Sequence, residues 1–216
     1  MSRTFFLLLA LLVSTCCLGA SADSTQQRRL QKLSDEMRLK KPKLKEDEYE
    51  VRIWNRQSLA YGDAQTLYRL IKRRKTFTVS KYIILWNTYE FKHATEFKST
   101  RPVPSELWQK LVELNMLTLP DMSALHDQLF PKPQNDSTWN VIEADGTVSV
   151  KAKIQKSRVI IADGEGYYLQ VFGKDSYHDY AYSNPFSYIK HRPDIVELGK
   201  VVAILNEVAQ LFTRMN

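Results

Sequence analysis

Hydrophobic and polar residues alternate along much of the chain, and this pattern predicts β-strands. At the first such segment apolar side chains stand at Tyr49, Val51 and Ile53, with charged residues between them. Side chains with a period of two point alternately to the two faces of a strand, so one face is expected to be buried. The same pattern predicts further strands at residues 67–71, 77–86 and 89–97.

The second half of the chain repeats this pattern around a strong hairpin turn at Asp145 and Gly146. The strands predicted there are residues 141–142, 148–154, 159–161, 167–172 and 177–182. Tight turns rather than helices join them, so an antiparallel arrangement is expected. Asn184 and Pro185 are expected to end the last strand.

Two segments have helical spacing instead. A helix is predicted over residues 105–116, with Ser105 as its N-cap. Residues 194–213 have apolar side chains at intervals of three and four, with Asp194 and Glu197 in capping-box spacing. Such a wide apolar stripe must be buried against another apolar surface, and one face of the predicted strands provides that surface. The expected fold class is α+β, a mostly antiparallel sheet packed against a C-terminal amphipathic helix and a shorter central helix.

The N-terminus has the pattern of a signal peptide over residues 1–22. An apolar run is followed by small residues that suit signal peptidase, so cleavage is expected between Ala22 and Asp23. The alternative is a lipoprotein signal with the lipid on Cys16, although Thr15 stands where that motif prefers Gly, Ala or Ser. The first signal predicts a periplasmic or extracellular protein, and the second predicts one anchored to a membrane by lipid.

Residues 23–48 are almost wholly polar and are predicted to form a short surface helix or a mobile lead-in. Leu30, Leu33 and Met37 give only a thin apolar stripe, and the basic run 40–45 is followed by three acidic residues. Nucleic acid or anionic lipid are alternative partners for that run. The nearly balanced charge of the segment instead favours a solvated surface.

The rest of the chain, residues 49–216, is expected to be globular. We expect either one region or two halves, 49–101 and 140–216, joined by the helical segment 102–139. Hydrophobic residues make up 44% of the sequence, an ordinary value for a folded protein. No apolar run after the signal reaches the 18 or so residues of a membrane span, so no transmembrane segment is expected there.

The composition excludes several kinds of chemistry after the signal. Cys16 and Cys17 are the two cysteines of the chain, so the remainder has no disulfide, thiolate ligand or cysteine nucleophile. It also lacks phosphate-binding glycine loops, serine-hydrolase elbows and zinc-protease motifs. No catalytic residue, cofactor or metal ligand is therefore assigned, and no nucleic-acid partner is expected. Asn135 begins a glycosylation sequon that would matter in a eukaryotic source.

The densest polar group of the sequence contains Asp175, His178 and Asp179. As an active site, His178 would be a general base oriented by one of the two acids, and the protein would be a secreted or periplasmic hydrolase. Strand alternation weakens this alternative, because His178 and Asp179 are expected to point to opposite faces. Turn geometry by itself also favours acidic residues and glycines between strands.

Tyrosines are crowded in the same region. On a sheet, some of their rings would face the core, while the outward set would form a recognition surface with polar edges. The candidate binding residues are Tyr167, Tyr177, His178, Tyr180 and Tyr182.

Several of these features together resemble a group of uncharacterised exported proteins, mostly bacterial. The resemblance spans residues 104–214, and its markers are Pro104-x-x-Leu107-Trp108, Leu119-Pro120, Asp145-Gly146 and Tyr177-x-x-Tyr180-x-Tyr182-x-Asn184-Pro185 before a terminal helix. It implies an α+β fold and export but no activity. The expected function is a non-catalytic binding or accessory protein of the cell envelope or extracellular space, acting on another protein or an envelope component. A lipid-tethered envelope structural protein is a further alternative.

Overall fold

The fold is described from a computed structural model, which covers residues 24–56, 65–87, 90–99, 102–131, 137–153, 161 and 164–213. The predicted signal, its cleavage site, Cys16 and Asn135 lie outside these residues. The chain divides into two compact units, Met1–Lys40 and Lys41–Asn216. None of the helices within the covered ranges is long and apolar enough to cross a membrane.

In the first unit, helix α2 spans Ser24–Glu36. Leu30 and Leu33 are buried, as is Ser34 on the same turn. The backbone N–H of Met37 donates to the carbonyl of Leu33, which extends the helical hydrogen bonding past its end. The thin apolar stripe of the sequence therefore lies on a real helix.

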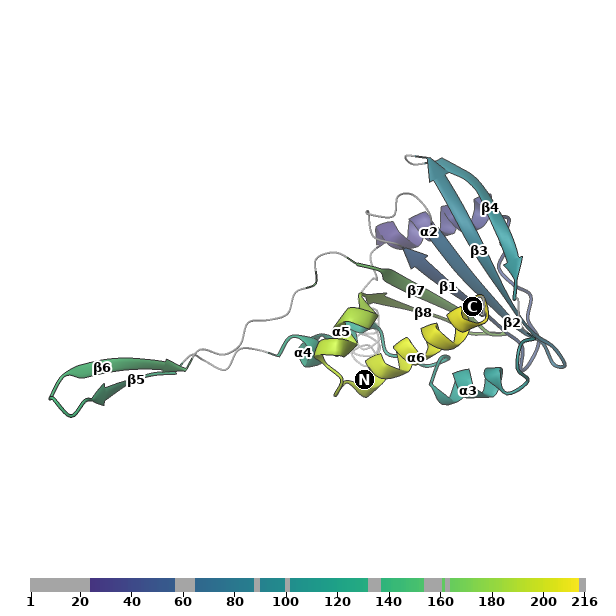
Figure 1. Cartoon of the computed structure of the whole chain (residues 1–216). Coiled ribbons are helices and arrows are strands. Elements are labelled where there is room, and N and C mark those ends of the chain that lie inside the picture. Colours follow the sequence, from purple (N-terminus) through teal and green to yellow (C-terminus); the bar gives the residue numbers. More distant parts are fainter. Residues whose placement is uncertain are drawn as a thin grey trace, which may run out of the picture. The chain divides into compact units, whose positions relative to one another are not determined.

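The second unit is built on a six-stranded antiparallel sheet in the order β4-β3-β2-β1-β7-β8 (Figure 1). Its strands are β1 Tyr49–Arg56, β2 Gln65–Lys72, β3 Phe77–Asn87, β4 Glu90–Lys98, β7 Gly166–Phe172 and β8 Tyr177–Ser183. Val51 of β1 lies opposite both Leu70 of β2 and Val171 of β7. Strands from the two halves of the chain therefore share one sheet, with β1 near its centre.

Helices cover one face of this sheet. The helices described in this unit are α3 Leu107–Glu113, the 3-10 helix η2 Met122–Leu125, α4 His126–Leu129, α5 Pro185–His191 and α6 Val196–Gln210. Leu111 of α3 and Val201, Ile204 and Val208 of α6 share a buried core with the apolar face of the strands (Figure 1). The predicted α+β fold, with the sheet packed against a C-terminal and a central helix, is confirmed.

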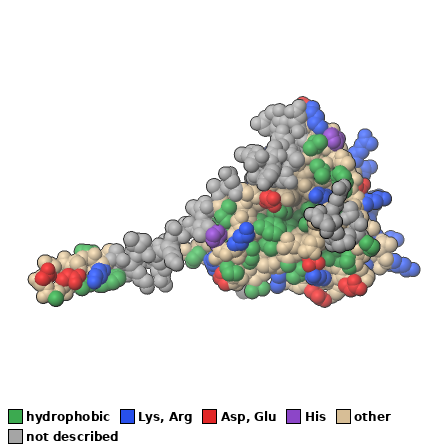
Figure 2. Space-filling view, viewed as in Figure 1, with side chains coloured by type: hydrophobic (Ala, Val, Ile, Leu, Met, Phe, Trp, Pro, Cys, Tyr) green, Lys and Arg blue, Asp and Glu red, His purple; other side chains and the backbone are tan. Residues whose placement is uncertain are grey.

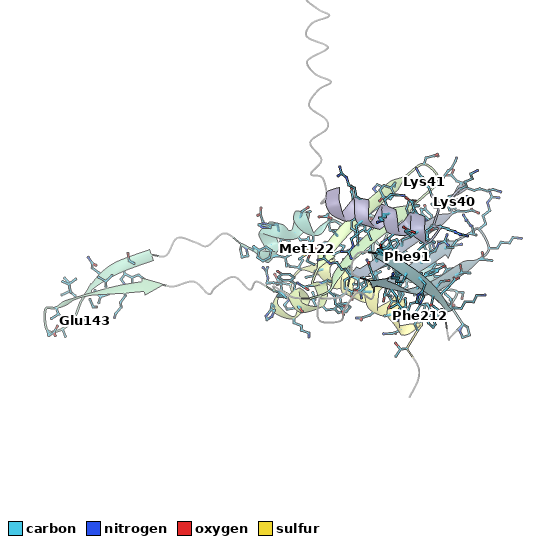
Figure 3. All side chains as sticks on the ribbon, turned by 90° about the horizontal axis from the view of Figure 1, so that it is seen from above. Lys40, Lys41, Phe91, Met122, Glu143 and Phe212 are labelled. Atoms are coloured by element: carbon cyan, nitrogen blue, oxygen red, sulfur yellow. The ribbon has the colours of Figure 1, made fainter. Side chains whose placement is uncertain are left out.

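The free edge of β8 is covered by η2. The Asp121 carboxylate accepts a hydrogen bond from the backbone N–H of Ala181 at 2.9 Å, and the Met122 sulfur accepts one from that of Ser183 at 3.1 Å (Figure 3). Edge strands with unpaired N–H groups invite pairing with other chains. These two side chains therefore protect the end of β8.

The predicted starts of the two main helices are wrong in detail. Ser105 does not cap α3, because its hydroxyl donates to the carboxylate of Glu106 at 2.7 Å and Glu106 occupies the N-cap position. Asp194 does not cap α6, because it forms an ion pair with Arg192 at 2.7 Å and the helix begins after Ile195. In both cases a neighbouring side chain competes with the helix for the capping group.

The predicted end of the strand run at Asn184 and Pro185 is instead the start of α5. Asn184 has a left-handed backbone with φ of 52°, and Pro185 takes the first helical turn. Proline is favoured there because its fixed φ suits the helix and its missing N–H would have no partner. A helix of seven residues is too short for its periodicity to stand out in the sequence.

The predicted Asp145-Gly146 hairpin forms a two-stranded sheet of its own, from β5 Ser137–Ile142 and β6 Val148–Lys153. Gly146 has a φ of 85°, and the Asp145 carboxylate accepts hydrogen bonds from the N–H and hydroxyl of Thr147. This hairpin has no strand pairing with the six-stranded sheet within the covered residues. Most of the strand predicted at 159–161 lies outside those residues.

Candidate binding surfaces

Two of the candidate binding tyrosines lie in the core of the sheet. Tyr180 and Tyr182 are 7% and 1% exposed. The Tyr180 hydroxyl donates to the carbonyl of Leu117 at 3.0 Å, and that of Tyr182 donates to the carbonyl of Pro120. Both rings therefore attach the segment after α3 to the sheet.

Tyr167 lies on the same face and is also buried. Its hydroxyl donates to the carboxylate of Glu165 and accepts a hydrogen bond from the Asn55 amide at 3.4 Å. Burial and the bond to Glu165 raise the pKa of Tyr167 far above its usual value, so the hydroxyl stays protonated. The Asn55 Oδ1 atom is buried and has no hydrogen-bond partner.

The remaining candidates lie at the other end of β8. Tyr177 is 45% exposed and belongs to the opposite face of the sheet, where its hydroxyl contacts Gln170 at 3.2 Å and Asp179 at 3.3 Å. His178 is exposed, and its side chain makes no hydrogen bond to any residue within the covered ranges. The five candidates are therefore divided between a buried set and a surface set.

The residues of the hydrolase alternative do not meet. Asp179 accepts hydrogen bonds from the hydroxyls of Tyr168 and Tyr177, on the face opposite to His178. Asp175 is 84% exposed and pairs with Lys174 at 3.7 Å. The geometry therefore gives His178 no acid to orient it. Within the covered ranges, no group of three or more His, Cys, Asp or Glu side chains could hold a metal ion.

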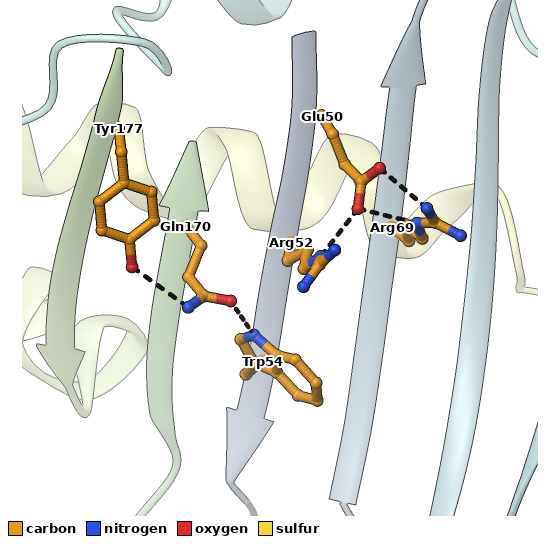
Figure 4. Close-up of polar contacts among 6 residues, drawn as sticks. All are labelled: Glu50, Arg52, Trp54, Arg69, Gln170 and Tyr177. Atoms are coloured by element: carbon orange, nitrogen blue, oxygen red, sulfur yellow. Dashed lines mark hydrogen bonds and ion pairs between the residues drawn. The ribbon is translucent and has the colours of Figure 1, made fainter. Parts of the chain in front are cut away.

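The sheet also carries a buried charge cluster that strand alternation does not predict. The Glu50 carboxylate is fully buried, and it accepts hydrogen bonds from Arg52 at 2.7 Å and from Arg69 at 2.8 and 3.0 Å (Figure 4). Arg52 is itself 3% exposed. Burial raises the pKa of Glu50, but the hydrogen bond from Arg69 and the positive charge of Arg52 outweigh it and hold that pKa below its ordinary value.

A second set of polar contacts lies on the same face of the sheet. The Trp54 indole N–H donates to the Gln170 side-chain oxygen at 2.8 Å, and the Gln170 amide donates in turn to Tyr177 (Figure 4). Hydrogen bonding with Glu50 raises the pKa of Arg69, against the effect of burial. The Glu50 cluster joins β1 to β2, and the contacts of Trp54, Gln170 and Tyr177 join β1 to β7 and β8. These polar groups are used within the fold.

The β5–β6 hairpin presents a different surface. Its register places Thr138, Asn140 and Ile142 of β5 on one face with Val148 and Val150 of β6. We call this set the apolar hairpin face. Ile142, Val148 and Val150 are 76%, 62% and 67% exposed, and no residue of the set is charged.

The opposite hairpin face and the turn carry the charges. Glu143, at the turn, accepts a hydrogen bond from the Ser149 hydroxyl at 2.6 Å and pairs with Lys151 at 3.8 Å (Figure 3). Trp139 lies on this side and is 47% exposed. The two faces of the hairpin are therefore chemically distinct, and only one lacks charge.

Comparison of the chain with family models, with curated proteins and with solved structures finds no match. The resemblance to uncharacterised exported proteins stays a prediction. The function is therefore argued from the surfaces alone.

Proposed function

We propose that this chain is an exported, non-catalytic protein that binds another protein through the apolar hairpin face. The observation that carries the proposal is the exposure of Ile142, Val148 and Val150 on one uncharged face. Single exposed apolar residues are common, whereas a contiguous set with no charge is typical of interaction sites. The same chain buries Val51 and Ile53 of its main sheet completely.

The energetics of a two-stranded sheet favour a partner. An isolated hairpin is marginally stable in water, because two strands cannot bury an apolar face between them. Covering an aliphatic side chain contributes roughly 1.5–3 kcal/mol when it passes from full exposure to full burial. Three side chains that are 62–76% exposed leave most of that contribution to be gained on binding.

The chemistry of the hairpin favours a protein over a lipid bilayer. The turn carries Glu143 and Asp145, and hydrogen bonding with Thr147 lowers the pKa of Asp145, so this carboxylate stays ionised. Insertion of the turn into hydrocarbon would require both carboxylates to lose their hydration, which is costly. An apolar protein surface can cover Ile142 and Val148 while the turn remains in water.

Export is the part of the proposal that rests on the sequence. Residues 1–22 have the order of a signal peptide, with an apolar run followed by small residues. Intact-mass analysis should find a mature protein that begins at Asp23. A mass that includes a diacylglyceryl group on Cys16 would support the lipid-tethered alternative.

Site-specific photo-crosslinking in the native host tests the binding surface. A photo-reactive residue at Val150 should give one discrete crosslinked product, whereas the matched control at Lys151, the next residue on the opposite face, should not. Ile142→Asp should remove the product from the Val150 position without changing the melting of the purified protein. Equal crosslinking from both positions, or no discrete product from either, would contradict the proposal.

A further inference from the structure

Three segments that are distant in the sequence meet at one end of the six-stranded sheet. They are residues 43–48 before β1, residues 72–75 at the end of β2 and the start of the turn to β3, and residues 173–176 between β7 and β8. Arg73 pairs with Glu48 at 3.1 Å, and Lys174 pairs with Glu46 at 3.0 Å. These ion pairs hold the segment before β1 beside both turns.

This end of the sheet is basic. The three segments contain seven basic residues and four acidic ones, which gives a net charge of +3. Glu46, Glu48 and Asp175 are engaged by Arg73 or Lys174. Lys43, Arg74 and Lys75 are exposed and form no side-chain hydrogen bond or ion pair within the covered residues. Figure 2 shows Lys and Arg side chains along the right-hand edge of the main body.

Lys72 has a different role from its neighbours. Its ammonium donates to the backbone carbonyls of Arg73 at 2.7 Å and Arg74 at 3.3 Å, which closes the turn. The turn is thus fixed by Lys72 and by the Arg73–Glu48 pair. Arg74 and Lys75 remain as exposed cations on a fixed support.

Three aromatic side chains lie at the same end. Tyr49 and Phe77 are the first residues of β1 and β3. Each lies directly opposite Lys72 of β2 in the register of the sheet. The Trp108 ring of α3 stacks on Tyr49 at 5.5 Å between ring centroids and meets Phe77 edge-on at 5.4 Å. All three rings are half-buried. We call these rings, together with the basic residues of the three segments, the basic–aromatic end.

We propose that the basic–aromatic end binds the headgroup region of membranes that contain anionic phospholipid. Basic side chains are attracted to the negative surface potential of such membranes, and Tyr and Trp favour the membrane–water interface. The cations lie on three separate segments rather than around one cavity, which suits a charged surface more than a single phosphate. The aromatic rings cover one another, so their faces are not open for stacking on nucleobases.

Vesicle co-sedimentation of the mature protein tests this proposal. Vesicles of phosphatidylcholine with 30% phosphatidylglycerol should bind the protein, pure phosphatidylcholine should bind it weakly, and added salt should reduce the difference. The variant Arg74→Gln/Lys75→Gln should bind about 25-fold more weakly, since each basic residue near an anionic surface contributes about fivefold.

The matched control is Lys151→Gln/Lys190→Gln, which removes the same charge from exposed residues outside the basic–aromatic end. It should change vesicle binding by less than about threefold. Equal loss in the two variants would show that net charge alone drives binding and would overturn the assignment of a site. Tighter binding to a DNA oligonucleotide than to the anionic vesicles, or complete competition by inorganic phosphate at the same phosphate concentration, would replace the membrane with another ligand. These outcomes report vesicle, DNA and phosphate binding and not protein crosslinking at the apolar hairpin face, so the two proposals can fail separately.

Discussion

The substitution Glu50→Gln tests the buried charge cluster of the sheet. Glu50 is fully buried, and its carboxylate is the partner of both Arg52 and Arg69. The amide of glutamine keeps the shape of the side chain but removes the negative charge. Arg52, which is 3% exposed, would then be buried without its counter-charge.

The expected cost follows from this burial. Removing one partner of a buried ion pair costs roughly 3–5 kcal/mol, because the other charge stays desolvated and uncompensated. Arg69 is 25% exposed and can recover some hydration, so we expect the lower part of that range, about 3 kcal/mol. This is a large fraction of the roughly 5–15 kcal/mol that stabilises a typical domain.

The loss should also depend on pH with a defined sign. The pKa of Glu50 is held below its ordinary value of 4.5 in the folded protein. A carboxyl group with a depressed folded pKa stabilises the protein fully above its unfolded pKa, and this contribution is lost as the pH falls through the folded value. The difference between the parent and Glu50→Gln should therefore be constant from pH 6 to 8 and shrink below about pH 4.5.

Urea unfolding of the mature protein at a series of pH values measures this difference. The control is Glu90→Gln in the same sheet, because Glu90 is 80% exposed and its contact with Lys92 is 3.5 Å long. Exposed pairs contribute little, so the control should unfold like the parent. A loss below about 1 kcal/mol for Glu50→Gln, or a difference that does not change at low pH, would refute this account of the cluster.

Three further changes have defined outcomes. Leu205→Ala in α6, where Leu205 is 3% exposed, should cost about 2–5 kcal/mol in urea unfolding, and a negligible cost would mean that α6 is not part of the core. Gly164→Ala would place a Cβ atom 1.7 Å from the Asn184 side-chain oxygen, so it should lower the melting temperature, whereas an unchanged melt would mean that Asn184 can move away freely. Mature protein should melt identically with and without reductant, because Cys16 and Cys17 both precede the expected cleavage site, and a reductant-sensitive melt would indicate that the signal is retained.

The strands of the main sheet were predictable because their alternation is local. A period of two at Tyr49, Val51 and Ile53 identifies β1 from a handful of residues. The pairing of β1 with β7 was not predictable, since Val51 meets Val171 across more than half of the chain and many apolar strands have the same pattern. Local patterning specifies the face of a strand but not its neighbour.

The candidate site was less predictable than the fold. Alternation placed Glu50 and Arg52 on the polar side of β1, which normally faces water. The structure buries both, and the Glu50 carboxylate accepts hydrogen bonds from Arg52 and from Arg69, which stands opposite Arg52 on β2. A polar position in a strand is read as exposed unless its cross-strand partner is known, so the charge cluster could not be found before the register.

On the other face of the sheet, the hydrogen-bond partners of the tyrosines were also not predictable from local patterning. Tyr180 and Tyr182 were candidates for binding because a ring with a hydroxyl suits a recognition surface. Their hydroxyls instead donate to the carbonyls of Leu117 and Pro120, which reach the sheet through the chain after α3. A tyrosine hydroxyl on a sheet is therefore available to a ligand only where no other segment of the chain covers it and accepts its hydrogen bond.

The apolar hairpin face contrasts with the interior of the main sheet. The main sheet buries Val51, Ile53 and Leu169 fully and compensates even the Glu50 carboxylate. Val196 of α6 is also 62% exposed, but it is a single residue, whereas Ile142, Val148 and Val150 lie together on one face of the hairpin. The hairpin and the basic–aromatic end belong to different sheets, and their chemistry is opposite, one uncharged and one cationic. Substitutions at either surface should therefore leave binding at the other unchanged, which allows each contribution to be measured in the intact protein.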